Sequence, residues 1–451
     1  MTASAGIGDF RPVERAREQK GWFFVDWAVS AFQTTVAGVL FAPYLIEIAK
    51  QAADDRNRIY LLGLPIDPGS LPSYVITFST ILSALTYPLI GAIADRTARK
   101  KDLMAAFAWA GALAAGLLFF MTGDNWLFGS VMFIIANLCA GCSVVVSDSI
   151  LPLISTENER DRTSSIGWAY GYAGGAILLA LNFLLMKFGG SIGIDTGMAV
   201  RLNLLSAAVW WAVFIIIPWR RIRNREPRDV EDVQGGLLGR SFGQLWITLK
   251  ELRRYPVAMT FLIAYLFFND GIQTVIGSAA QYGTEELGFV LDTMLLVYLL
   301  VQFVAVGGAV VFSRAAARFG AKHVILAGLG TWILVVIGAF LLPEKQLPLL
   351  LVVGVGIGLV LGGTQALARS YFSLLIPAGK EAEFFSLYHA MDRGTSWMGT
   401  LVFGLVHQFT GSFRPSILAL IAFFVIGGVL LARVDTAKGI EQAGNRAPER
   451  I

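Results

Sequence analysis

A few ionisable side chains lie deep inside long apolar stretches of this sequence. Asp270 occurs within YLFFNDGIQTVI (265–276), and Asp392 and Arg393 directly follow SLYHAM (386–391). An arginine can bind a carboxylate through two parallel hydrogen bonds, and an aspartate can accept an ammonium group or a proton. These three residues are therefore candidates for binding a small zwitterionic solute. The alternative is a static salt bridge that only satisfies itself.

Amide side chains accompany these charges. Asn269 precedes Asp270, and Gln273 lies three residues after it, on the same face of a helix. Gln33 lies in the first apolar stretch and matches Gln273 when FQTTVAG is aligned with IQTVIGS. An amide can both donate to and accept from a polar solute. The predicted solute-binding residues are Gln33, Asn269, Asp270, Gln273, Asp392 and Arg393.

Side chains that can exchange a proton lie in the same stretches. His389 precedes Asp392 by three residues and so shares its helical face, and histidine gains and loses a proton near physiological pH. The alternatives are a histidine that bonds to a backbone carbonyl, and an Asp26 that reaches water or caps a neighbouring helix. The proton-coupling candidates are Asp26, Asp270, His389 and Asp392.

Twelve unbroken apolar stretches must position these residues. A bilayer core of roughly 30 Å needs about 20 apolar residues per helix, and the blocks lack the alternation of barrel strands. We therefore expect an all-α polytopic membrane protein. The predicted helices are 22–49, 71–94, 103–121, 126–150, 163–186, 200–218, 257–281, 290–311, 323–342, 347–371, 384–407 and 413–432.

Composition and charge agree with this class. The chain is 55% hydrophobic and 15% charged, with 48 glycines and a net charge of +4. Most of the 36 Lys and Arg residues fall in alternate loops that include both ends of the chain, which predicts cytoplasmic termini. This distribution accounts for the basic residues without a nucleic-acid partner. The first twenty residues lack the features of a secretory signal, so the first helix should act as its own insertion signal.

Motifs of enzymes and metal sites are missing from the sequence. The CAGC segment (139–142) has no second Cys or His cluster to complete a metal site, and small-residue packing explains it better. No Walker loop, HExxH or suitably placed GxSxG occurs. We expect no enzymatic activity, metal or cofactor, and energy from an ion or solute gradient rather than from ATP.

Weak internal similarity divides the chain into two six-helix halves. The segment 147–175 aligns with 368–396 at the same place in each half. The region 241–255 within the linker could form an amphipathic helix on the membrane surface or stay solvated. The expected organisation is a tail (1–21), a bundle (22–218), a cytoplasmic linker (219–256), a bundle (257–432) and a second tail (433–451).

The loop GAIADRTARKK (91–101) resembles the signature loop of the major facilitator superfamily, with Ala98 where glycine is usual. The resemblance implies two pseudo-symmetric bundles that rock around a central site near the bilayer midplane. Asp148 and Arg369 end two further helices at equivalent positions, and Asp148 is a candidate partner for Arg96 or Arg99. The predicted inner gate comprises Gly91, Asp95, Arg96, Arg99, Lys100, Asp148 and Arg369. Positive-inside anchoring alone is the alternative for this loop.

Further segments resemble a narrower branch of that superfamily, the one that includes the fungal vacuolar amino-acid effluxer linked to autophagy. They are FFVDWAVSAF (23–32), SSIGWAYGYAGG (164–175), YLFFNDGIQTVI (265–276) and the stretch 362–390. The resemblance implies a secondary active transporter of an amino-acid-like solute. The histidines and buried acids of the chain allow proton coupling without requiring it. The alternatives are a transporter of a sugar, peptidoglycan fragment, drug or lipid, and a non-transporting receptor or scaffold. We expect a monomer in the bacterial inner membrane, with a small-molecule solute and membrane lipid as partners.

Overall fold

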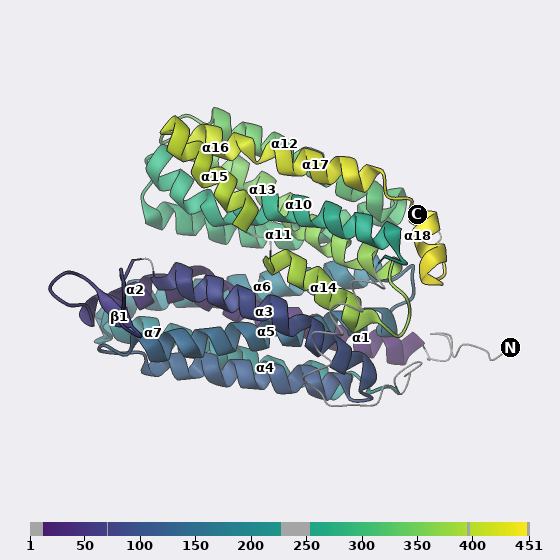
Figure 1. Cartoon of the computed structure of the whole chain (residues 1–451), viewed down its shortest axis with the longest axis horizontal. Helices are drawn as coiled ribbons and strands as arrows, with labels where there is room; N and C mark the ends of the chain where they lie inside the picture. The colour runs from purple at the N-terminus through teal and green to yellow at the C-terminus, as the bar shows by residue number, and fades with distance from the viewer. Residues whose placement is uncertain (1–11, 70, 227–252, 395–396, 449–451) are drawn as a thin grey trace.

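The computed structural model describes residues 12–69, 71–226, 253–394 and 397–448, which are almost entirely helical. Figure 1 shows two bundles lying side by side, one from each half of the chain. The first bundle contains α1 (Pro12–Ala31), η2 (Phe32–Leu40), α2 (Phe41–Gln51), α3 (Leu71–Arg96), α4 (Lys100–Leu117), η3 (Leu118–Phe120), α5 (Trp126–Ile154), α6 (Arg160–Phe188), η4 (Gly189–Ile192), α7 (Thr196–Phe214) and α8 (Ile216–Arg221). The expected all-α architecture is confirmed.

The second bundle begins after the linker. It contains α10 (Pro256–Gln281), η5 (Tyr282–Glu286), α11 (Leu291–Phe319), α12 (Ala321–Leu341), α13 (Leu347–Leu374), α14 (Glu381–Gly394), α15 (Trp397–Thr410), α16 (Phe413–Ala419), α17 (Ile421–Ala432) and α18 (Thr436–Ala443). Among the described residues, eleven helices are long and apolar enough to cross a membrane. The remaining predicted span, 384–407, corresponds to α14 and α15 together.

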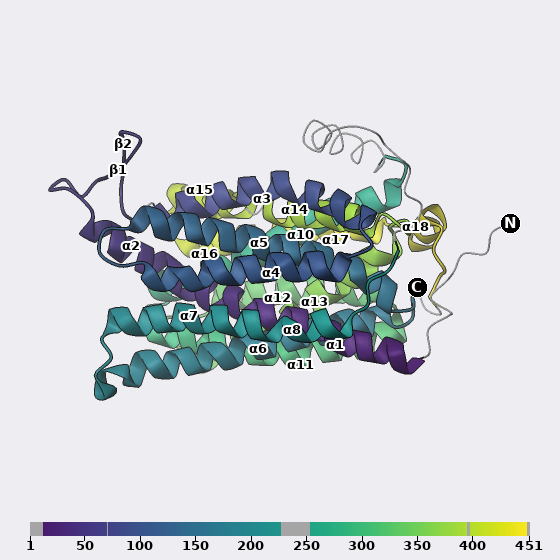
Figure 2. The same cartoon turned by 90° about the horizontal axis from the view of Figure 1, so that it is seen from below.

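The two ends of the molecule are distinct. The start of α1 and the short helix α18 lie at one end, called here the α18 end (Figures 1 and 2). A β-hairpin formed by β1 (Ile59–Leu61) and β2 (Leu64–Ile66) lies at the opposite end, called here the hairpin end. Leu62 and Gly63 both have positive φ, which is the geometry of a tight two-residue turn. This hairpin was not predicted, because two strands of three residues each give little periodic signal between two apolar stretches.

Helix α1 is longer than the sequence indicated. It runs from Pro12, whereas the prediction began at residue 22 and assigned 1–21 to a tail. Its polar first turns contact the residues that follow α8: the Glu18 carboxylate is buried, accepts a hydrogen bond from the backbone N–H of Arg223 at 2.9 Å and pairs with Arg225. Hydropathy could not detect a helix stabilised by such polar contacts. Similarly, α18 occupies part of the expected second tail, while the predicted linker helix at 241–255 falls mostly outside the described residues.

Each bundle has its own apolar core. Trp22, Phe41 and Trp211 are fully buried in the first, and Trp332 and Phe372 in the second. The bundles meet where α14 lies against α3, and where α6 lies against α11 and α13. Figure 1 shows α14 between the bundles, toward the α18 end. This arrangement leaves the helices that carry the predicted site residues facing one another.

Candidate functional site

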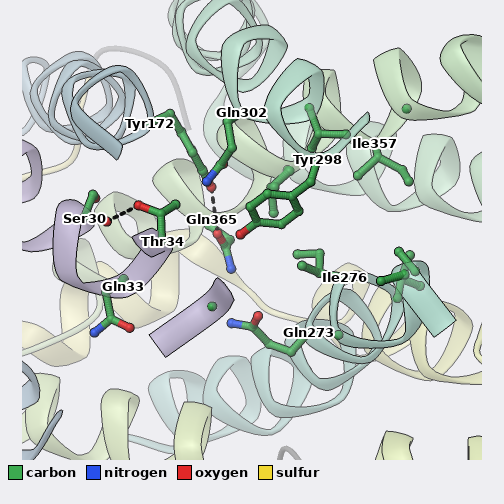
Figure 3. Close-up of a pocket in the computed structure, with 18 of the residues that line it drawn as sticks. Ser30, Gln33, Thr34, Tyr172, Gln273, Ile276, Tyr298, Gln302, Ile357 and Gln365 are labelled. Atoms are coloured by element: carbon green, nitrogen blue, oxygen red, sulfur yellow. Dashed lines mark hydrogen bonds between the residues drawn. The ribbon is translucent and has the colours of Figure 1, made fainter. Parts of the chain in front are cut away.

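A cavity of about 560 Å³ lies between the two bundles. Its walls come from α1, η2, α3, α5 and α6 of the first bundle and from α10, η5, α11, α12, α13, α14 and α16 of the second. The second bundle contributes a broad apolar wall that includes Ile276, Val301 and Ile357. Polar side chains from both bundles share the space, and Figure 3 labels Ser30, Gln33, Thr34, Tyr172, Gln273, Tyr298, Gln302 and Gln365.

Four of these polar residues are glutamines. Gln33 comes from η2, and Gln273, Gln302 and Gln365 come from three helices of the second bundle. The Tyr172 hydroxyl donates to Gln365 Oε1 at 3.1 Å, which links the bundles across the cavity (Figure 3). Because an amide both donates and accepts, this part of the cavity can bind neutral polar groups as well as charged ones.

The polar residues of the first helix are positioned by a change in helix type and by glycines. Residues Phe32–Leu40 form a π-helical segment, a feature often found at functional sites. The glycines of α6 allow a close approach: a Cβ at Gly171 would lie 2.8 Å from Ser30 Oγ, and one at Gly175 would lie 2.6 Å from Thr34 Oγ1. Larger residues at these two positions would push α6 away from the cavity wall.

A group of charged residues lines the cavity toward the α18 end. This arginine cluster comprises Arg369, Asp26, Asp148 and His389, each from a different helix. Arg369 Nη2 lies 3.1 Å from Asp26 Oδ2, and Arg369 Nη1 lies 3.2 Å from Asp148 Oδ1. His389 Nε2 lies 2.9 Å from Asp148 Oδ2. Because Arg369 and His389 belong to the second bundle and both acids to the first, the cluster joins the two bundles.

The surroundings of Arg369 bury its guanidinium group and complete its coordination. Its Nε donates to Ser164 Oγ at 2.9 Å and its Nη2 to the Ser164 carbonyl at 3.0 Å. The guanidinium carbon lies 4.7 Å from the ring centroid of Trp22 and 5.4 Å from that of Trp168. The side chain of Arg369 is only 3% exposed. Interactions between charges are stronger at buried positions than in water, so the cluster is a firm contact between the bundles.

A second polar contact lies closer to the α18 end, at the start of α14. The Asp95 carboxylate accepts hydrogen bonds from the backbone N–H groups of Ala382 and Glu383, at 3.1 and 2.9 Å, and pairs with Lys100 at 2.7 Å. An acid at a helix N-terminus is stabilised by the unpaired N–H groups and by the helix dipole. A Cβ at Gly91 would lie 2.5 Å from the carbonyl oxygen of Ala382, so glycine permits this approach of α3 to α14.

The structure brings many of the predicted residues to this cavity. Its lining includes Gln33, Gln273, Asp392, Asp26, His389, Asp148 and Arg369. Asn269 is not part of the lining; it donates to Asp392 and accepts a hydrogen bond from Gln365 at 3.4 Å. Asp270 also lies outside the lining, because its carboxylate faces α15 and accepts the backbone N–H of Gly399 at 2.7 Å. Arg393 lies on α14, but its side chain is outside the described part of the structure.

Other predicted residues are placed differently from expectation. Asp148 contacts Arg369 and His389, not Arg96 or Arg99, because it faces the middle of the molecule while both arginines are exposed. Arg99, which directly precedes α4, instead pairs with Asp102 in the first turn of that helix, at 3.0 Å. Asp26 is deeper than expected, because its helix begins ten residues earlier than predicted.

Sequence reasoning also missed residues that line the site. Gln302 and Gln365 are buried in predicted membrane helices, and Ser164 binds Arg369. The two glutamines could have been found by the criterion applied to Gln33, a polar side chain within an apolar stretch. Ser164 gave no comparable signal, since a serine can bond to its own helix backbone within a membrane.

Comparison with known proteins shows where this chain belongs. Residues 14–444 match the family model described as "Vacuole effluxer Atg22 like". The chain is 28% identical, over 96% of its length and 98% of the relative's, to the uncharacterized MFS-type transporter YxiO of Bacillus subtilis. It is 23% identical to Autophagy-related protein 22 of Botryotinia fuckeliana, over 98% of this chain and 87% of the relative.

The fold leads to the same superfamily. The proton:xylose symporter XylE, solved with bound 6-bromo-6-deoxy-D-glucose, superimposes with a TM-score of 0.71 over 96% of this chain and 99% of that one, at 12% identity. The protein is thus an integral membrane transporter of the major facilitator type, which binds a small-molecule solute and is not an enzyme. Within that superfamily, the chain belongs to the vacuole effluxer Atg22-like family.

Proposed function

We propose that this protein is a secondary active transporter that moves a small polar solute by alternating access, with the solute bound in the cavity between the bundles. The observation that carries the proposal is the arginine cluster, which lines the cavity and joins helices of both bundles. In the proposed scheme this cluster seals the cavity toward the α18 end. Alternating access requires a seal of this kind on one side, which breaks when the bundles rock.

The proposal includes an orientation. The loops and termini at the α18 end carry most of the Lys and Arg residues, which supports a cytoplasmic location for that end. The conformation described here is then the one closed to the cytoplasm. The Bacillus relative supports placement in a bacterial inner membrane, and a single chain supplies both walls of the cavity, as a functional monomer would require.

An amino-acid-like solute is the favoured cargo. The family match to vacuole effluxers supports it, and the cavity offers an acid, Asp392, to an ammonium group. Arg393 remains the proposed partner for a carboxylate, with the amides of Gln33, Gln273 and Gln302 as further donors. Asp270 is not assigned to the solute, because it does not line the cavity.

One observation favours a second class of cargo. Four glutamines and the Tyr298 hydroxyl face the cavity, whereas Arg369, the arginine in its described lining, is already engaged by two acids and Ser164. Neutral amides and hydroxyls suit a hydroxyl-rich solute such as a sugar, which needs paired donors and acceptors and no counter-ion.

The same cluster supports the proposal of proton coupling. Opening toward the cytoplasm separates Arg369 from Asp26 and Asp148, which exposes or isolates two acids. A proton on Asp26, or on the His389–Asp148 pair, lowers the cost of that separation because a neutral acid needs no cation. Asp392, three residues from His389, is the acid closest to the bound solute in this scheme.

Gradient-driven flux into proteoliposomes tests the proposal. Labelled amino acids and sugars are offered with an imposed pH gradient, first in one direction and then in the other. We expect accumulation of one class, lost in Gln273→Ala and kept in Gln281→Ala, the matched change on the same helix outside the cavity. Flux of sugars alone would support the second cargo class. Flux no greater than in protein-free liposomes for both classes would count against transport of either.

A further inference from the structure

Asp270 occupies a contact within the second bundle that the solute-binding scheme does not use. Its Oδ2 accepts the backbone N–H of Gly399, in the first turn of α15, at 2.7 Å. Helix α15 lies against α10 at this point (Figure 1). A Cβ at Gly399 would collide with Thr274 Oγ1 and lie 3.2 Å from the Asp270 carbonyl oxygen, so the two backbones approach closely here.

The carboxyl group has little else to stabilise a negative charge. Asp270 is 1% exposed, its Oδ1 has no hydrogen-bond partner, and the neighbouring Thr274 Oγ1 also has none. Among the described residues, Asp392 on α14 is the charged group that interacts electrostatically with Asp270, and an ionised Asp392 would repel an ionised Asp270.

Within the part of the chain that the structure describes, the other helices that pack near Asp270 present uncharged groups to this contact. Helix α17 presents Phe423 and Phe424 to the adjacent Gly271, and α13 presents Gln365 to Asn269. Helix α15 contributes the backbone of Gly399. No cation of the described residues therefore compensates an ionised Asp270.

The neutral acid fits this contact better than the anion does. A buried carboxylate without a cation is strongly disfavoured, and one N–H bond with part of a helix dipole offsets only a fraction of that cost. A protonated Asp270 still offers an oxygen to the Gly399 N–H. This differs from Asp26 and Asp148, whose charges are balanced by Arg369.

We propose that Asp270 is a proton-binding positioning residue outside the solute cavity, which holds its proton while α15 lies against α10 and drives the two helices apart when the proton leaves. The O–H bond of the carboxyl group breaks, the proton passes to water, and the new anion becomes hydrated only if α15 moves away. This inference rests on the proposed proton-coupled transport and names a coupling site for it.

The test measures the exposure of the α10–α15 contact against pH. Cys139 and Cys142 are replaced by serine, and Thr274→Cys supplies a single buried thiol on α10. The purified full chain in lipid nanodiscs is labelled with a small methanethiosulfonate between about pH 5 and pH 9, around the range in which carboxyl groups and thiols titrate. Each rate is divided by that of a chain with Gln281→Cys, an exposed position on the same helix, which removes the effect of pH on thiol chemistry.

We expect the rate ratio to rise with pH by up to about tenfold per unit, as for one ionising group. The rise should vanish in Asp270→Asn, which is permanently neutral, and persist in Asp392→Asn. A ratio that does not change with pH, or one that rises equally in Asp270→Asn, would overturn the proposal.

Hydrogen exchange provides a second reading without any substitution. Peptides covering α15 in the unsubstituted protein should exchange faster at high pH than intrinsic rates predict, and an unchanged protection would also overturn the proposal. Neither measurement uses a solute or a gradient. A negative result in these two measurements would therefore contradict the role of Asp270 without contradicting transport. Absence of flux would contradict the proposed transport without changing the expected pH dependence of labelling.

Discussion

Replacing Arg369 by methionine should release the two bundles from each other at the α18 end. The substitution keeps much of the apolar stem but leaves Asp26 and Asp148 without their cation, and Asp148 is only 2% exposed. Removing one partner of a buried ion pair costs about 3 to 5 kcal/mol. Because this contact joins the bundles, the cost falls on the conformation closed at the α18 end. At about 1.4 kcal/mol per factor of ten, the equilibrium shifts by more than about a hundredfold.

Distances between spin labels at the α18 end measure this shift. In a background without Cys139 and Cys142, labels at Arg17→Cys on α1 and Lys438→Cys on α18 occupy exposed positions, one on each bundle. Pulsed electron resonance should find a population with longer distances in Arg369→Met.

A variant without the charges is the matched control for this measurement. Adding Asp26→Asn and Asp148→Asn to Arg369→Met removes every formal charge at the two ion pairs, and it should restore most of the short-distance population because no uncompensated charge remains. Unchanged distances in Arg369→Met, together with an unchanged unfolding temperature, would refute the view that this cluster holds the bundles together.

Three further predictions concern the α18 end and the packing around the cluster. Gly167→Ala should lower the free energy of unfolding by about 1 to 3 kcal/mol, since its Cβ would lie 2.6 Å from Asp26 Oδ2, and thermal unfolding in detergent measures this. Asp95→Asn should weaken the contact between residue 95 and the first turn of α14 by about 1 to 2 kcal/mol. Hydrogen exchange should then be faster in residues 381–386 and unchanged in α12. Burial raises the pKa of Glu159, but hydrogen bonds from the Thr156 backbone and from Arg15 outweigh it and leave that pKa below its usual value. The Arg15 contact should therefore stabilise the protein above the ordinary glutamate pKa, and this stabilisation should be lost as the pH falls through the lowered pKa. Its contribution to the free energy of unfolding should be less than about 1 kcal/mol, because the pair is part-exposed. In Glu159→Gln this part of the acid dependence of the unfolding temperature should be absent.

Much of the fold was predictable because each membrane helix is a long run of apolar residues that can be recognised in the sequence. The apolar stretches located the eleven helices of the described residues that are long and apolar enough to cross a membrane. The internal similarity predicted two halves, and Figure 1 shows one bundle from each half of the chain. Gly167, Gly171 and Gly175 are spaced four apart on α6, and the structure places them against Asp26 and Ser30 of α1 and Thr34 of η2.

The candidate site was less predictable, because it depends on which face each helix turns toward its neighbours. The depth of Asp270 in its helix followed from counting residues, but its side chain turns to α15, where Gly399 allows close approach. Likewise, no local pattern links Asp148 to Arg369, which are 221 residues apart in sequence. The start of α1 was missed because polar contacts stabilise it, and the hairpin was missed because it is built around a two-residue turn. Neither feature produces a periodic pattern of apolar residues.

Side-specific labelling of one cavity thiol tests alternating access most directly. Ser30→Cys lines the cavity and, without Cys139 and Cys142, is the single target for a membrane-impermeant reagent in right-side-out and inside-out vesicles. We expect the chain with intact Arg369 to be labelled mainly from the hairpin side, and the chain with Arg369→Met to gain labelling from the α18 side. If the chain with intact Arg369 and the chain with Arg369→Met were labelled to the same extent from each side, control of access to the cavity by this arginine would be contradicted.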